Sequence, residues 1–130
     1  MSKLLFVIEF GGFSLRLDDF KKAGHTVEFA KSMRKALPLL KKMQPDLLVA
    51  EFNYTSQFRD RDSNLDTILT QIQSRSPHTE VIAFVEEEQK IHFERLKSRF
   101  PQIVGELYFP FDDNALSQSI AKALDEKAKE

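Results

Sequence analysis

The sequence predicts a single α/β domain in which five parallel β-strands alternate with five helices. Five short, largely apolar runs alternate along the chain with five segments whose apolar residues recur at helical spacing. The strand-like runs are nearly continuous in apolar residues, as strands buried on both faces of a parallel sheet must be. The chain has 130 residues and no linker-like stretch, so we expect one domain, with a core from about residue 3 to residue 125 and a charged tail at 126–130.

The predicted strands are bounded by residues that break regular structure. Gly11 and Gly12 interrupt the first apolar run, and Pro110 ends the last one. Consecutive parallel strands need right-handed crossovers, so the helices should cover both sides of the sheet. The expected strands cover residues 3–9, 26–30, 46–51, 80–85 and 103–109.

Local signals also mark the ends of the predicted helices. Gly24 can end the first helix as a C′ residue, and Ser32 can cap the start of the second. Pro38 lies inside the second helix and should kink it or delay its start. The expected helices cover residues 14–22, 32–43, a segment that includes 65–72, 89–100 and 112–124.

Phenylalanine is the main aromatic residue, with 12 Phe against two Tyr and no Trp. Three of these residues lie inside strand-like runs and are expected in the core: Phe6, Phe29 and Phe84. The helix at 89–100 is expected to bury Ile91, Leu96 and Phe100. Four more phenylalanines fall just beyond strand ends, where ligands bind in open parallel sheets: Phe10, Phe52, Phe109 and Phe111.

Composition argues against several classes of function. The net charge is −1, so no overall field favours nucleic acid or an anionic membrane. Cysteine is absent, which excludes disulfides, thiolate nucleophiles and Cys-based metal sites. No apolar run approaches the roughly 18 residues that span a bilayer, and the first residues do not resemble a signal peptide. We therefore expect a cytoplasmic protein without nucleic-acid or membrane partners.

Three stretches of the chain resemble the receiver domain of bacterial response regulators. Residues 35–51 look like the second helix and third strand of that family, and residues 79–84 look like its fourth strand. Pro110, Phe111 and Asp112 resemble the Lys-Pro-Phe stretch that opens the family's last helix. The stretches occur in order and at the family's spacing. The resemblance covers essentially the whole chain and implies a CheY-like, flavodoxin-like (βα)5 fold with strand order 2-1-3-4-5.

The resemblance also locates a phosphoacceptor pocket that has lost its chemistry. Receivers hold Mg²⁺ on two acids after the first strand and on an acceptor aspartate, with a Ser/Thr after the fourth strand and a Lys before the last proline. None of the five matching positions carries the family's usual residue: Ile8, Glu9, Glu51, Val85 and Phe109.

Physical chemistry indicates what these replacements do. The Glu51 carboxylate is displaced by one methylene, about 1 Å, and a misplacement of that size can cost about 100-fold in rate. Phe109 supplies no charge for a transferring phosphoryl group, and Val85 offers no hydrogen-bond donor. We expect neither phosphotransfer nor a bound Mg²⁺ or other cofactor.

Some alternatives at the strand ends stay open. Glu9 and Glu51 could chelate a divalent ion together with the Asn53 carbonyl, or one of the two acids could take up a proton. Gly11 and Gly12 could cradle a phosphate, although a plain turn is favoured because no G-x-G-x-x-G or P-loop lysine follows. Phe109 either plugs the former charged pocket, which we favour, or extends the core; an apolar docking spot for a partner is a further interpretation of these phenylalanines.

No pattern in the sequence points to an enzyme. His25, His78 and His92 lack metal-ligand spacing, and no Ser/His/Asp order stands out, so a small α/β hydrolase has no nucleophile–base pair.

The fourth helix is basic on balance, and in receivers the fourth helix, fifth strand and fifth helix form the usual partner or dimer face. Candidate contact residues are Lys90, Arg95, Lys97 and Glu106, the last at the position of the family's switching aromatic. A solvated charged face is the alternative. The long polar loop at 53–64 could also contact a partner or be solvated.

These observations favour a stand-alone atypical receiver, a pseudo-receiver, in two-component signal transduction. It would act through protein–protein contact without phosphorylation, with signalling proteins or a second copy as partners. The alternative is a divergent phospho-accepting, metal-binding or small-ligand-binding switch that uses the Glu9/Glu51 cleft.

Overall fold

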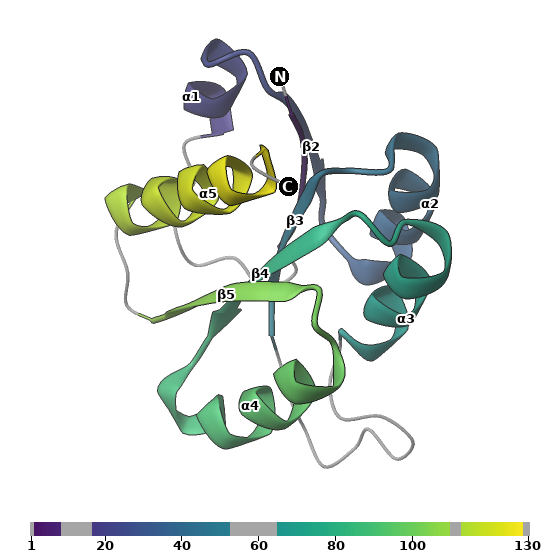
Figure 1. Ribbon diagram of the computed structural model, residues 1–130, viewed down its shortest axis with the longest axis vertical. Coiled ribbons are helices and arrows are strands. Elements are labelled where there is room, and N and C mark those ends of the chain that lie inside the picture. The colour runs from purple at the N-terminus through teal and green to yellow at the C-terminus, as the bar shows by residue number, and fades with distance from the viewer. Residues whose placement is uncertain (1, 9–16, 53–64, 110–112, 129–130) are drawn as a thin grey trace.

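The computed structural model describes residues 2–8, 17–52, 65–109 and 113–128, and in it the strands form one parallel five-stranded sheet. The strand order is β2-β1-β3-β4-β5, with helices on both faces of the sheet (Figure 1). The predicted α/β class, the parallel sheet and the strand order implied by the resemblance are confirmed.

The strands agree closely with the sequence prediction. Their bounds are β1 Lys3–Val7, β2 Thr26–Ala30, β3 Leu47–Glu51, β4 Glu80–Val85 and β5 Ile103–Tyr108. The differences lie at the ends, because Ile8, Asp46 and Phe109 fall just outside the strands to which they were assigned.

The helices follow the expected order. Their bounds are α1 Leu17–Lys22, α2 Met33–Met43, α3 Asp66–Arg75, α4 Lys90–Arg99 and α5 Asp113–Ala128, with a 3₁₀ turn η1 at Glu87–Gln89 before α4. The last helix continues through Ala128, beyond its expected end at residue 124, so the first residues of the predicted charged tail at 126–130 are helical. Charged residues continue a helix readily, and sequence polarity alone therefore does not mark its end.

Two predicted caps are present in the structure. Gly24 has φ of 96° and donates its N–H to the Lys21 carbonyl at 3.0 Å, which ends α1 in a conformation that glycine adopts without strain. The Ser32 hydroxyl accepts a hydrogen bond from the Lys35 N–H at 3.2 Å and satisfies one free donor at the start of α2.

Pro38 does not delay the start of α2, which was one of the two effects predicted for it. The helix begins at Met33 and runs through Pro38. The proline removes only the bond to the Arg34 carbonyl, one residue into the helix, where both residues are exposed and water can replace the lost donor. Ala36 and Leu40, on the other face, are buried and fix the helix to the sheet.

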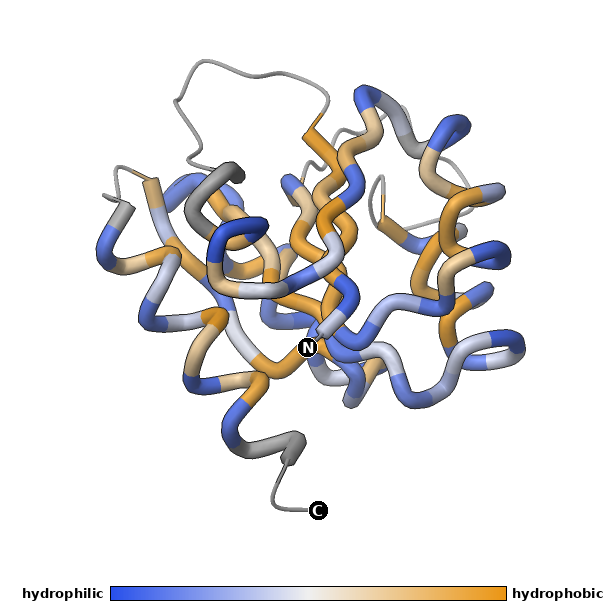
Figure 2. The backbone as a smooth tube through the Cα atoms, turned by 90° about the horizontal axis from the view of Figure 1, so that it is seen from above, coloured by the Kyte–Doolittle hydropathy of each residue, from blue (hydrophilic) through white to orange (hydrophobic). Residues whose placement is uncertain are grey.

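The core consists of two hydrophobic clusters, one on each face of the sheet. Side chains alternate along each strand, so β1 sends Leu5 and Val7 to one cluster and Leu4 and Phe6 to the other. The helices α2, α3 and α4 cover the first cluster, whereas α1 and α5 cover the second. Hydrophobic residues accordingly concentrate in the middle of the molecule, while hydrophobic and hydrophilic residues alternate within the turns of the helices (Figure 2).

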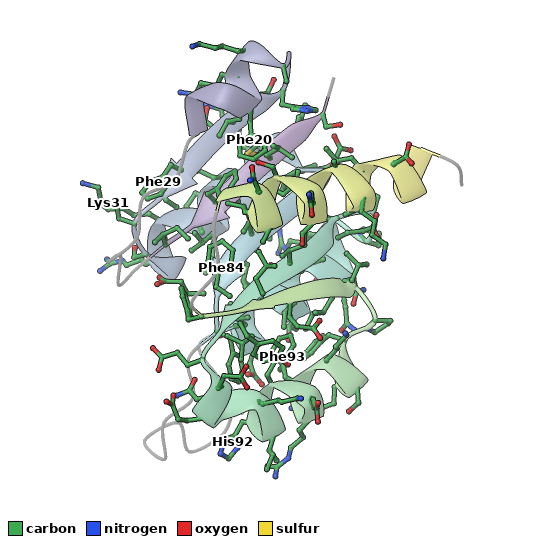
Figure 3. All side chains as sticks on the ribbon, turned by 90° about the vertical axis from the view of Figure 1, so that its left-hand side faces the viewer. Phe20, Phe29, Lys31, Phe84, His92 and Phe93 are labelled. Atoms are coloured by element: carbon green, nitrogen blue, oxygen red, sulfur yellow. The ribbon has the colours of Figure 1, made fainter. Side chains whose placement is uncertain are left out.

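Two residues assigned to the core are exposed. Phe29 is 40 % exposed because β2 is an edge strand with helix cover over only part of it, and Figure 3 shows its side chain on that strand. Ile91 is 74 % exposed. Leu96 and Phe100 are buried as expected, and Phe93 is buried in place of Ile91, because Ile91 and Leu96 are five residues apart and point about 140° away from each other.

A buried hydrogen-bond chain joins the starts of β3 and β4. The Ser76 and Thr79 hydroxyls lie 2.6 Å apart, and the Thr79 hydroxyl donates to the carbonyl of Pro45. Ser76 and Thr79 are almost fully buried. Since Thr79 donates to Pro45, the Ser76 hydroxyl must donate to Thr79, so one side chain satisfies two buried groups.

Thr79→Val should therefore destabilise the protein although it conserves shape. It leaves the Ser76 hydroxyl and the Pro45 carbonyl buried without their partner, and we expect the free energy of unfolding to fall by about 1–3 kcal/mol. Urea unfolding followed by circular dichroism measures the change. Thr70→Val is the matched control, because Thr70 is exposed and its hydroxyl donates to the Asp66 carbonyl of its own helix. Equal midpoints for the two variants would contradict a structural role for the buried chain.

Candidate functional site

The carboxyl ends of four adjacent strands carry the described members of the predicted phosphoacceptor pocket. Ile8 follows β1, Glu51 is the last residue of β3, Val85 is the last residue of β4, and Phe109 follows β5. Backbone bonds fix these ends: the Ile8 N–H donates to Ala30 at 3.0 Å and the Phe109 N–H donates to Val85 at 3.0 Å. The structure thus places all four residues at one edge of the sheet.

Side-chain alternation divides these four residues between the two faces. Ile8 belongs to the cluster that α1 and α5 cover, and Phe109 packs against that same cluster. Glu51 has the same strand parity as Leu47 and Val49 of this cluster and points to the same side. Val85 lies in the other cluster, beneath α4. The structure therefore brings Ile8, Glu51 and Phe109 to one side and directs Val85 into the opposite core.

Phe109 packs into the apolar core at this edge. Its ring lies edge-to-face against Phe84, with centroids 6.1 Å apart and an interplanar angle of 71°. Phe84 is fully buried on the α5 side of the sheet (Figure 3), and Phe109 is half-buried. Such aromatic pairs are favourable beyond the area they bury. At the position where the receiver resemblance calls for a lysine, the chain thus has a ring continuous with the core.

Glu51 is a buried acid in this setting. It is 6 % exposed, and in the sheet register it lies opposite Phe84. The β1–β3 pairing ends with Val7 opposite Ala50, so Ile8 is the residue of the first segment nearest to Glu51 in register. Ile8 is also 6 % exposed. The Glu51 carboxylate is therefore largely shielded from solvent, unlike an acid that is open to a phosphodonor or a metal ion.

Several predicted features lie outside the described residues. These are Glu9, the Asn53 carbonyl, the Gly11–Gly12 turn, Phe10, Phe111 and the loop at 53–64. Within the described ranges there is no group of three or more His, Asp or Glu side chains arranged to hold a metal ion. Phe52 is described and extends the core: it is 4 % exposed and packs edge-to-face on Phe93, with centroids 5.3 Å apart.

The face formed by α4 and β5 brings together two of the predicted contact residues. The Lys97 ammonium lies 2.9 Å from the Glu106 carboxylate and joins the helix to the strand. The Lys90 ammonium lies 5.7 Å from the centre of the Tyr108 ring. Arg95 is exposed on the same helix. We call Lys90, Arg95, Lys97, Glu106 and Tyr108 the α4–β5 face.

Tyr108 is a member of this face that the sequence did not indicate. Burial, followed by the negative charges of Glu106, Glu94 and Glu87, raises the pKa of its phenol above the usual value. The phenol therefore stays neutral at neutral pH and offers a hydrogen-bond donor beside a cation. The sequence places Tyr108 directly before Phe109, at the end of the predicted last strand. Its contact with Lys90 could not be predicted, because the two residues are 18 positions apart in the chain.

The three histidines lie in separate places, as the sequence predicted. His25 Nδ1 accepts the Ser2 N–H at 3.3 Å, and His78 Nε2 lies 3.1 Å from the Gln44 carbonyl, both at turns. His92 lies on α4. Among the described residues, no helix combines the length and the apolar character that crossing a membrane requires.

Comparison with known proteins identifies the fold. No protein-family model and no curated protein sequence matches the chain. A response regulator receiver domain protein from Clostridium thermocellum superposes with a TM-score of 0.74 at 20 % identity, over 98 % of both chains. The signal receiver domain of a putative LuxO repressor protein from Vibrio parahaemolyticus gives 0.72 at 17 % identity, over 98 % of this chain and 92 % of that one.

A third solved structure agrees with these two. The signal receiver domain of a modulated diguanylate cyclase from Desulfovibrio desulfuricans gives a TM-score of 0.70 at 18 % identity, over 98 % of this chain and 97 % of that one. The chain therefore has the fold of CheY-like receiver domains over nearly its whole length, as the resemblance implied.

Phe109→Ala tests whether the ring at the strand ends is part of the core. Removing a half-buried ring that packs on Phe84 should lower the free energy of unfolding by about 1–3 kcal/mol. Ile91→Ala is the control: it removes a large apolar side chain that is 74 % exposed, and it should change the free energy of unfolding by less than about 0.5 kcal/mol. Chemical denaturation of both variants measures the difference. A change for Phe109→Ala as small as that of the control would show that the ring does not plug this edge.

Proposed function

We propose that this chain is a pseudo-receiver: a module with the receiver fold that acts in signal transduction by binding protein partners, without being phosphorylated. The observation that carries the proposal is the Phe109 ring, which packs on Phe84 where a receiver needs a lysine. We propose further that the domain catalyses no reaction of its own and works in the cytoplasm.

The chemistry of phosphoryl transfer supports this interpretation. The transferred group needs cations and hydrogen-bond donors fixed around its oxygens, and these contribute most of the stabilisation. A phenyl ring at 109 contributes no positive charge, and the Ile8 side chain supplies no oxygen ligand for Mg²⁺. Val85 has no hydroxyl and is fully buried in the opposite core. Restoring the reaction would require several substitutions at once.

The α4–β5 face supports a role in binding. It presents Lys90 and Lys97, which are already oriented by Tyr108 and Glu106, and the exposed Arg95, which points about 140° away from Lys90 around the α4 axis. At the position of the family's switching aromatic, Glu106 is held by Lys97 instead. A partly exposed ion pair of this kind contributes at most about 1 kcal/mol to stability, so its value lies in orienting charge. The proposed partner is a signalling protein that carries acidic groups, or a second copy of the chain.

Phosphorylation can be tested directly with a variant that shortens the acid. Glu51→Asp, incubated with Mg²⁺ and a small phosphodonor, should show no phosphoryl adduct in intact-protein mass spectra, and neither should the wild type. The missing lysine and hydroxyl are not restored by this change. A receiver domain with the full set of active-site residues serves as the positive control. Efficient labelling of Glu51→Asp or of the wild type would refute the pseudo-receiver proposal and favour the phospho-accepting alternative.

Partner binding through the α4–β5 face can be tested by reversing its charge. Lys90→Glu combined with Arg95→Glu should remove partners that wild-type protein captures from lysate of its own cells, compared by quantitative mass spectrometry. The Lys97–Glu106 pair is left intact, so the fold should be unaffected. Lys21→Glu combined with Lys22→Glu, at the end of α1, is the control of equal charge change. Loss of the same proteins from both variants would indicate nonspecific attraction.

A further inference from the structure

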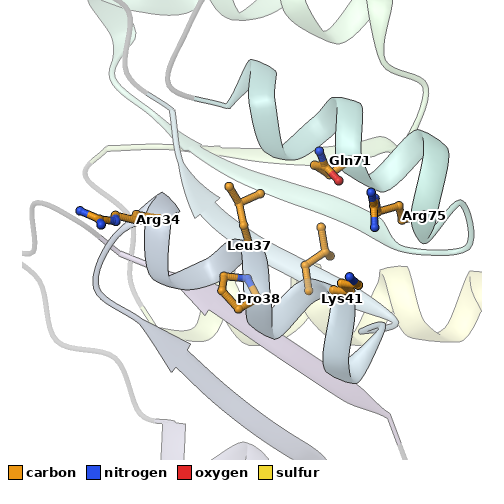
Figure 4. Close-up of a pocket in the computed structure, with 7 residues that line it drawn as sticks. Arg34, Leu37, Pro38, Lys41, Gln71 and Arg75 are labelled. Carbon is orange, nitrogen blue, oxygen red and sulfur yellow. The ribbon is translucent and has the colours of Figure 1, made fainter.

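A groove of about 420 Å³ lies between α2 and α3, apart from both the strand ends and the α4–β5 face. Its apolar lining comes from Leu37, Pro38 and Leu40 of α2, and its cationic lining from Arg34, Lys41 and Arg75. Figure 4 shows Leu37 and Pro38 between Arg34 and Lys41 along α2. Gln71 completes the lining from α3. A groove of this volume lies within the usual range of ligand sites.

The lining residues of α2 recur at the spacing of a single helical face. Arg34, Leu37, Pro38 and Lys41 occupy positions i, i+3, i+4 and i+7. The two cations are therefore about 10 Å apart along the helix axis, with the apolar residues between them. In Figure 4, Arg34 lies at one end of the groove, whereas Lys41 and Arg75 lie together at the other.

The charge of this groove is of one sign. Three cations and no carboxylate line it. All three are exposed, and within the described part of the chain none of them has an ion-pair partner. A net charge of −1 for the whole chain means that this local excess is compensated elsewhere, so the groove attracts anions locally.

Pro38 gives the groove a second unusual property. It is an exposed proline inside a helix, where its ring packs little. Its backbone nitrogen carries no hydrogen and cannot donate to the Arg34 carbonyl. Core packing does not account for a proline there. The ring does give the groove a rigid apolar surface between Arg34 and Lys41.

We propose that this groove binds an acidic amphipathic helix of a partner protein. Carboxylates at i and i+7 of that helix would face Arg34 at one end and Lys41 with Arg75 at the other. An apolar side chain at i+3 or i+4 would rest on Leu37 and Pro38. Amphipathic helices commonly bind in grooves of this kind, with anchors at these spacings. Two of the three cations lie at the Lys41 end of the groove. The partner helix should therefore lie with its more acidic end next to Lys41 and Arg75. The site is independent of the proposed function, because a receiver that accepts phosphate could use it equally.

Binding can be measured by fluorescence anisotropy with a labelled, stapled helical peptide as the probe. The peptide carries Glu at i and i+7 and Leu at i+3 and i+4. We expect saturable binding below about 1 mM that weakens as salt increases, since the charges are exposed. Arg34→Glu and Lys41→Glu should each weaken binding by about 10-fold.

Matched variants separate this groove from general charge attraction. Lys35→Glu and Lys42→Glu change the same charge at neighbouring, exposed positions of α2 that do not line the groove, and they should bind like the wild type. A peptide with Ala in place of both Leu residues should bind at least about 10-fold more weakly. Because every substitution is at an exposed position, circular dichroism should report an unchanged fold.

Several outcomes would overturn the proposal. These are the absence of saturable binding, equal weakening by Arg34→Glu and Lys35→Glu, and equal binding of the Ala peptide. Tighter binding of duplex DNA of similar charge would identify a polyanion site instead. Dimerisation of the unliganded protein that Arg34→Glu abolishes in sedimentation would assign the groove to a second copy of the chain.

Discussion

Burial of the central strands on both faces is the constraint on which the rest of the molecule depends. Residues 4–7, 47–51 and 81–85 are all buried, so each strand must supply apolar side chains in both directions. Two clusters follow, and each requires helices to cover it, which fixes the layered arrangement. Side chains from several strands, far apart in the sequence, then lie close together at the edge where the parallel strands end.

The same constraint shapes the strand-end site. A polar pocket at this edge has to be maintained against two adjacent cores. At two positions of the predicted pocket the side chains are apolar: Ile8 belongs to the core cluster on that face, and Phe109 packs against it. The proposed functions lie accordingly on helices and on an edge strand, where charged side chains remain exposed above buried supports. Lys97 is an example: it reaches Glu106 from the rim of the helix face that holds Phe93 and Leu96 in the core.

Much of the fold could be predicted because its signals are local. Apolar runs, Gly24 and Ser32 act through neighbouring residues, and the bounds of β2 and β4 were predicted to the residue. Phe29 and Ile91 were misplaced because exposure depends on which strand lies at the edge and on the helix phase set by packing. The site positions were predicted by resemblance, but the direction of Val85 into the opposite core follows from strand alternation in the folded sheet. The groove could not be predicted, because Gln71 and Arg75 reach α2 only in the tertiary structure.

The open edges of the sheet have a consequence for behaviour at high concentration. In the described part of the chain, β2 and β5 each pair with a single strand, and each exposes a large apolar side chain, Phe29 and Val104. Unpaired backbone groups beside such side chains can template intermolecular β-pairing and aggregation. On β2, the exposed Glu28 adjoins Phe29, and the strand is only five residues long. A short edge strand with a charged residue beside its apolar one is a poor template for a fibril. The length of β2 and the charge of Glu28 therefore oppose aggregation at this edge of the sheet.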